Sequence, residues 1–300
     1  MTASTKRTRF VSFVIGCGLL PVALAQEPTA PTETDPVAAI VAEMRSAETA
    51  LRAVALEMTT SGQLPGGLAV TTRGSLRVLR GTHPAIQTRL EYQFADGLRG
   101  QLESVEDADG VTIFEDNPAF GELHLRIAPK EVADLRWAGE VLQRSDLPGM
   151  HDARADAPLG SGMVADLQRH FELKPDGRKT RSDATGTAEP GVWLVGRRRP
   201  GLDVEDPDVP LADRVEVFVR GRDHALLEVR ELQGDTELQH IVVGRLEVDP
   251  TLDPASFRVD ARDVPLRDVS QHLPMWERIQ KVLLKAEAKA GEGQVRPSRR

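Results

Sequence analysis

The chain of 300 residues has 46 acidic and 38 basic side chains and a formal net charge of −8. Its basic clusters are short, at Arg197–Arg199 and Arg296–Arg300, so the chain is not expected to bind nucleic acid, which requires Lys and Arg at the phosphates. Its single cysteine, Cys17, excludes a structural thiolate site, and the seven histidines show no metal-ligand spacing such as H-x-x-H. We therefore expect no metal and no cofactor.

Residues 1–25 have the pattern of a secretory signal peptide: a basic start, an apolar run and a small-residue cleavage site at Ala23-Leu24-Ala25. Cleavage near Ala25 predicts a periplasmic or secreted protein with 46 acidic against 35 basic residues, a net charge of −11. In the alternative, Cys17 belongs to a lipoprotein processing box and carries a lipid anchor. The sequence stays apolar after Cys17, which favours cleavage near Ala25.

A polar linker over residues 26–36 leads into an amphipathic helix. Asp35 is the predicted N-cap and Pro36 the first helical residue. Apolar residues then recur at spacings of three and four, which predicts a helix that ends between Thr59 and Gly62: Ile40, Met44, Ala47, Leu51, Val54 and Met58. A stripe of this length must pack against a larger surface.

The pattern then changes to alternation, which is typical of strands with one dry face. In residues 87–94 the apolar members are Leu90, Tyr92 and Phe94, and in residues 122–127 they are Leu123, Leu125 and Ile127. Short turns such as Ala95-Asp96-Gly97 separate the strands, and turns of this length predict an antiparallel meander.

Two helical segments are predicted in the middle of the chain, over residues 130–145 and 162–171. In the second, Met163, Leu167 and Phe171 form one apolar stripe. The segments 147–160 and 175–190 are rich in Pro, Gly and Asp, which predicts loops.

Strands are predicted again over residues 192–196, 214–221, 225–233 and 238–248, with a charged loop over 199–213. Val215, Val217 and Val219 face one side of their strand. We expect one domain over residues 37–273, followed over 274–300 by a short helix with Trp276 and a flexible tail.

Four short segments, together with the order helix, meander, helices, meander, resemble the periplasmic lipoprotein carrier (LolA-like) superfamily: Gly74–Arg80, Asp109–Phe114, Leu227–Asp235 and Leu252–Val259. The resemblance covers roughly residues 37–265 and departs from the family pattern at Gly81, where the family usually has proline. It implies an α+β fold, an open, half-closed antiparallel β-barrel covered by an N-terminal helix and central helices.

The resemblance also implies a non-enzymatic, monomeric chaperone of the envelope that carries lipid or lipoprotein acyl chains. Arg80 matches the family arginine that bonds lid-helix carbonyls and holds the empty state closed; the alternative is a solvent-facing strand residue. Twelve residues are candidates for the hydrophobic cavity: Leu90, Tyr92, Phe94, Leu123, Leu125, Ile127, Met163, Leu167, Phe171, Val215, Val217 and Val219. The alternative for these side chains is a filled core against the first helix.

Two other functions stay open at this point. The same fold could be a regulatory or scaffold domain that binds an envelope protein, with the long loops and the Trp276 helix as its interface. A secreted hydrolase is the third hypothesis, but no G-x-S-x-G motif is present and no two of the 46 acids can be paired from sequence. We therefore do not expect an enzyme.

Overall fold

The computed structural model describes residues 35–63, 69–118, 121–129, 132, 159–182, 186–200 and 211–268. Its helices are α2 (Pro36–Ala50), α4 (Gly160–His170) and the short η1 (Pro254–Ser256). Its strands are β1 (Ala53–Gln63), β2 (Ala69–Leu79), β3 (Ala85–Phe94), β4 (Arg99–Asp107), β5 (Gly110–Asn117), β6 (Gly121–Ile127), β7 (Phe171–Pro175), β8 (Thr180–Ser182), β9 (Ala188–Arg198), β10 (Arg214–Arg220), β11 (Leu226–Gln233), β12 (Thr236–Val248) and β13 (Arg267–Asp268).

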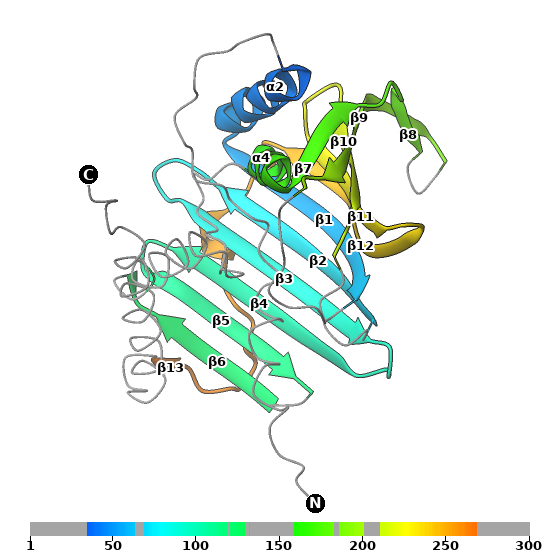
Figure 1. Ribbon diagram of the computed structural model, residues 1–300. Helices are drawn as coiled ribbons and strands as arrows, with labels where there is room; N and C mark the ends of the chain where they lie inside the picture. Colours follow the sequence, from blue (N-terminus) through cyan, green and yellow to red (C-terminus); the bar gives the residue numbers. More distant parts are fainter. Residues whose placement is uncertain are drawn as a thin grey trace, which may run out of the picture.

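The strands form one large curved sheet in the order β13-β6-β5-β4-β3-β2-β1-β12-β11-β10-β9-β7, with β8 paired to β9 (Figure 1). Two antiparallel meanders, β1–β6 and β9–β12, join where β1 pairs with β12. The pairs are antiparallel except β13 with β6. The sheet does not close, because β7 and β13 stand at its two ends, so the predicted open, half-closed antiparallel barrel of the α+β class is confirmed.

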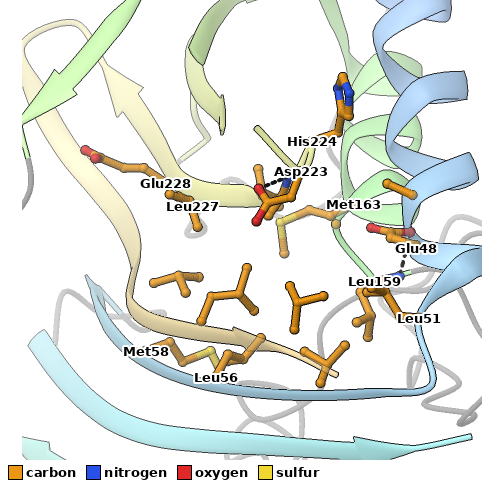
Figure 2. A pocket seen from close by; sticks show the side chains of 18 of the residues that line it. Glu48, Leu51, Leu56, Met58, Leu159, Met163, Asp223, His224, Leu227 and Glu228 are labelled. Atoms are coloured by element: carbon orange, nitrogen blue, oxygen red, sulfur yellow. Dashed lines mark hydrogen bonds between the residues drawn. The ribbon is translucent and has the colours of Figure 1, made fainter. Parts of the chain in front are cut away.

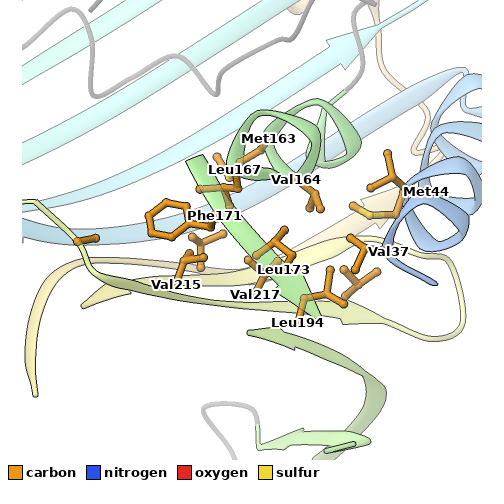
Figure 3. Packing of buried hydrophobic residues seen from close by; sticks show 14 of the residues in the cluster. Val37, Met44, Met163, Val164, Leu167, Phe171, Leu173, Leu194, Val215 and Val217 are labelled. Atoms are coloured by element: carbon orange, nitrogen blue, oxygen red, sulfur yellow. The ribbon is translucent and has the colours of Figure 1, made fainter. Parts of the chain in front are cut away.

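Helices α2 and α4 lie side by side over one end of the sheet, on the face that we call the inner face (Figure 1). The main core fills the space between these helices and strands β7, β9, β10 and β11 (Figure 3). Val164, Leu194 and Val215 have no exposed surface in this core. Truncation of a side chain so enclosed typically costs about 2–5 kcal/mol, so this cluster is a major source of stability.

Helix α2 is shorter than the sequence predicts. Its start is as expected, since Asp35 Oδ1 accepts a hydrogen bond from Val37 N at 2.9 Å. The helix ends at Ala50, however, and residues 53–63 form β1, so the prediction of a helix to Thr59–Gly62 is wrong. The spacing of Leu51, Val54 and Met58 fits a helix, but Val54 and Met58 also share one face of a strand, and β1 is paired on both sides.

The other strands predicted from alternation are present within a few residues of the expected bounds. The helix predicted over 162–171 is α4, which begins at Gly160 and ends at His170. The segment 175–190 is not only a loop, because it contains β8 and the start of β9. The predicted signal peptide, most of the helix over 130–145 and the Trp276 helix lie outside the described residues.

The segment after β12 crosses the opposite, outer face of the sheet. Phe257 packs on Ala85 and Val105, the Asp260 amide donates to Glu103, and His124 Nδ1 lies 2.9 Å from the carbonyl of Val264. Residues 249–268 therefore cross strands β2 to β6, and we call this segment the strap. Neither of the two longer helices that the structure describes has the length and apolar character needed to cross a membrane.

Candidate functional site

A cavity of about 130 Å³ lies on the inner face, between the sheet and the facing ends of α2 and α4 (Figure 2). Its floor comes from β1, β11 and β12, its side from the two helices, and its rim from the β10–β11 turn. Most of the lining is apolar: Ala47, Leu51, Val54, Leu56, Met58, Leu159, Met163, Ala225, Leu226, Leu227, Val229, Ile241, Val243, Leu246 and Val248. The remaining lining residues are Glu48, Gly160, Asp223, His224 and Glu228.

The floor follows from strand alternation. Val54, Leu56 and Met58 point to the inner face because every second residue of a strand does so. On β12, Ile241 and Val243 continue the same surface, and a register irregularity follows next to Glu57 and Met58 of β1. A bulge of this kind bends a strand and increases its twist, which curves the floor beneath the helices.

The Glu48 carboxylate joins the two helices beside the cavity. It accepts hydrogen bonds from Leu159 N at 3.1 Å, Ser161 N at 2.8 Å and Ser161 Oγ at 2.5 Å. The residue before α4, Leu159, provides no side-chain cap of its own. Glu48, which is only 8% exposed, therefore caps α4 from another helix, and its charge is favourable at a helix N-terminus.

Arg80 fixes the other end of the same junction. Its Nη1 donates to the main-chain carbonyl of Glu48, and its amide donates to the Arg52 carbonyl at 2.9 Å. The carbonyls in the last turn of a helix lack partners within the helix, and arginine is well suited to bind them. The sequence resemblance predicted a bond to a lid helix; the structure places it on the C-terminal turn of α2.

Charged groups form the rim without occupying the cavity. His224 has a positive φ of 54° and its Nδ1 lies 3.5 Å from Glu43 Oε2 of α2. Asp223 pairs with Arg220 at 2.6 Å. Glu228 points away from the cavity in Figure 2, and its Oε2 lies 3.0 Å from Arg181 Nε. The interior of the cavity is thus left to the apolar side chains.

Of the twelve residues predicted for a hydrophobic cavity, only Met163 lines this one. Five others belong, as Met163 also does, to the filled core of Figure 3, which was the alternative interpretation: Leu167, Phe171, Val215, Val217 and Val219. The other six share the inner face of β3 and β6 and do not line the cavity, although Leu90 belongs to the cluster that contains its floor: Leu90, Tyr92, Phe94, Leu123, Leu125 and Ile127.

Leu56, Val243 and Glu48 line the cavity but are not among the residues predicted from sequence. Alternation within residues 53–58 and 238–248 was the available signal for the first two. No local pattern reveals Glu48, because its partners are 111 and 113 residues away in sequence. Within the described residues, no three His, Cys, Asp or Glu side chains gather as metal ligands would.

No known family profile matches the chain, and no curated protein matches it. Among solved structures it is similar to MucB (12% identity, 75% of this chain and 63% of that chain covered, TM-score 0.40). It is also similar to an uncharacterized conserved protein from Thermus thermophilus (10%, 77% and 98%, TM-score 0.37) and to a putative outer membrane lipoprotein-sorting protein domain from Vibrio parahaemolyticus (11%, 73% and 94%, TM-score 0.29). The chain thus spans 63% of the length of MucB.

Proposed function

We propose that this chain is a non-enzymatic binding protein of the cell envelope that takes the acyl chain of a lipid or lipoprotein into the cavity beneath α2 and α4. The observation that carries the proposal is the lining, in which apolar side chains from three strands and two helices enclose one space. Apolar cavities of similar size, about 150 Å³, stay dry and bind small hydrocarbons. Export to the envelope rests on the signal peptide predicted over residues 1–25.

The cavity is large enough for part of an acyl chain but not for a whole one. A volume of about 130 Å³ accommodates a short hydrocarbon segment, so a full acyl chain requires the helices to separate from the sheet. Each methylene moved out of water contributes about 0.8 kcal/mol, so six contribute about 5 kcal/mol. A side-chain cap such as that of Glu48 on α4 contributes about 1–2 kcal/mol, which is less than the gain from the ligand.

The test is binding of a dansyl fatty acid to delipidated protein, together with native mass spectrometry of the protein as purified. Ala47→Leu fills the cavity from α2, and Ala42→Leu makes the same change on the exposed side of that helix. We expect saturable binding by the unchanged chain and by Ala42→Leu. The affinity of Ala47→Leu should fall about tenfold, which corresponds to about 1.4 kcal/mol of lost contact.

The proposal fails if no lipid co-purifies and no saturable binding is seen, or if Ala47→Leu binds as well as Ala42→Leu. Capture of one envelope protein by the unchanged chain and by Ala47→Leu alike, without lipid binding, would instead support a scaffold function.

A further inference from the structure

A second hollow, of about 560 Å³, lies on the outer face, where the strap crosses β2 and β3. Arg77 and Arg89 contribute from the strands, and the strap contributes Ser256, Arg258, Val259 and Asp260. This hollow and the apolar cavity lie on opposite faces of the sheet. Leu76 and Leu90, the neighbours of Arg77 and Arg89 in sequence, lie in the inner-face cluster with Leu159, so the two arginines face the other way.

Arg77 is held in a fixed position at this hollow. Its Nη1 donates to Gln87 Oε1 at 2.9 Å and its Nη2 donates to Ser256 Oγ at 2.7 Å. Its guanidinium carbon also lies 4.8 Å from the ring centroid of Phe257, within the range of a cation–π contact. All these partners are uncharged, so the positive charge of Arg77 is not neutralised by them.

A buried polar network fixes these partners. Gln87 is 1% exposed, and its Nε2 donates to Glu103 Oε1 and to the Arg258 carbonyl, both at 2.9 Å. Both amide hydrogens of Gln87 are thereby used, which leaves its Oε1 to accept from Arg77. Glu103 Oε2 accepts from Asp260 N at 3.1 Å, so the network also holds the strap in place.

The charges at the hollow do not balance. Arg89 pairs with Glu103 at 2.7 Å, whereas neither Arg77 nor Arg258 has an acidic partner among the described residues. Asp260 is the only acid in the lining, and its Oδ1 accepts from Arg262 N in the next turn. Three guanidinium groups against two carboxylates leave an excess of positive charge, in a chain with a net charge of −8.

The two buried arginines in the part of the chain that the structure describes, Arg181 and Arg220, both have acidic partners. Arg181 lies 3.0 Å from Glu228, and Arg220 lies within 3.0 Å of both Glu189 and Asp223. The charges of Arg181 and Arg220 are therefore neutralised within the fold. Arg77 and Arg258, which have no acidic partner among the described residues, keep guanidinium N–H donors free for a ligand.

We propose that this outer-face hollow binds a phosphate-type oxyanion. Guanidinium groups match the geometry of phosphate oxygens and form short, charge-assisted hydrogen bonds with them. A pre-positioned Arg77 loses little side-chain freedom on binding, and the exposed Arg258 can close over the anion. The anion is either a free phosphate compound or the phosphate of a lipid headgroup, and it binds on the opposite face from the apolar cavity.

The experiment measures binding to the chain from Gln26 to Arg300 in two arms. Titration calorimetry at low salt uses inorganic phosphate and pyrophosphate. Co-sedimentation uses vesicles of phosphatidylcholine with and without phosphatidylglycerol. The variants are Arg258→Gln and the double variant Arg77→Gln/Arg258→Gln. The control is Arg73→Gln, which removes one charge from the same face of β2 outside the hollow.

We expect Arg258→Gln to weaken binding about tenfold, the usual effect of losing one charged hydrogen bond, and the double variant to abolish it. Arg73→Gln should bind as the unchanged chain does. Binding of phosphate or pyrophosphate with this dependence identifies a free anion, and binding only to phosphatidylglycerol vesicles with the same dependence identifies a headgroup.

Absence of binding in both arms overturns the proposal. An equal loss in Arg73→Gln and Arg258→Gln also overturns it, because that result describes a general charge effect. Arg258→Gln carries the test even if the double variant fails to fold, since the Arg258 side chain is exposed and has no hydrogen-bond or ion-pair partner in the described part of the chain.

Discussion

The carboxylate of Glu48 accepts hydrogen bonds from both the amide and the hydroxyl of Ser161, which lies 113 residues further along the chain. Through this contact the C-terminal turn of α2 caps the N-terminus of α4, directly beside the cavity. The main-chain carbonyl of Glu48 accepts from Arg80. One residue thus connects β2, α2 and α4, and movement of α4 away from the sheet requires this connection to break.

Glu48→Ala should lower the free energy of unfolding by about 2 kcal/mol, because it removes a helix cap and leaves buried donors without partners. Amide hydrogen exchange in α4 should also become faster than in the core strands, since the loss acts on this helix first. Chemical denaturation and exchange measured by mass spectrometry test both expectations. Arg45→Ala, on the exposed side of α2 and outside the cavity lining, is the control, and an equal effect of the two changes would contradict the role of Glu48.

Arg80→Leu should lower the free energy of unfolding by about 1 kcal/mol through the lost bond to the α2 carbonyl. If Arg80 also holds the unliganded state closed, the dansyl fatty acid should enter this variant faster, as stopped-flow fluorescence can measure. Because Arg80 and Glu48 act on the same junction, their combined loss should differ from the sum of the single losses. Additive effects and unchanged uptake would leave Arg80 an ordinary strand-end residue.

The fold was predictable from sequence where alternation is local and strong. Val215, Val217 and Val219 mark β10 because their period of two admits no helix. The junction after α2 was not predictable, since Val54 and Met58 fit both periods and only the pairing of β1 with β2 and β12 decides between them. Tertiary contacts of this kind commonly override local preference.

The candidate site was less predictable than the fold. Alternation shows which side chains are dry but not whether a helix or empty space lies above them. Val217 and Val243 both stand in strands predicted from alternating apolar residues. Val217 nevertheless packs in the core against α2, while Val243 lines the cavity. The difference depends on where α4 begins, and Glu48 fixes that position from a distant part of the chain.

Glu231, at the edge of the core, should make the free energy of unfolding depend on pH. Burial raises the pKa of Glu231 above its ordinary value of 4.5, and the nearby charge of Arg198 offsets only part of this effect. The folded state therefore holds the proton more strongly than the unfolded state, and stability is lost as the pH rises through the raised pKa.

Glu231→Gln removes this cost, so the variant should unfold at a higher temperature than the unchanged chain at pH 7.5, and the difference should vanish below about pH 4. Thermal unfolding at the two pH values measures it, with the exposed Glu91→Gln as control. A variant less stable than the unchanged chain at pH 7.5 would show that the Glu231 carboxylate has a favourable partner.

Close packing of a glycine against an aromatic ring gives a prediction for the inner face. A Cβ added to Gly100 would lie 2.3 Å from the ring of Tyr92, its partner on β3. Gly100→Ala should therefore cost about 1–3 kcal/mol, the usual range for overpacking. Chemical denaturation measures the loss, and Gly100→Ala combined with Tyr92→Leu should recover part of it if the clash is the cause.

Asp249 should make the junction between α2 and β1 sensitive to acid. Its Oδ1 accepts from Ala53 N at 3.0 Å and from Arg52 N at 2.6 Å, and these bonds lower its pKa below the ordinary 3.8. A depressed pKa contributes stability that is complete above the ordinary value and is lost as the pH falls through the folded-state value.

Asn suits the positive φ of 50° at position 249, so Asp249→Asn removes the charge without adding backbone strain. The variant should be less stable than the unchanged chain at pH 7, and the difference should shrink as the pH falls below the ordinary pKa of 3.8. Urea denaturation across this range measures the convergence, with Asp253→Asn, the cap of η1, as a control for general charge removal. A difference that persists undiminished into acid would mean that the shape of the side chain, rather than its charge, holds the β1 amides.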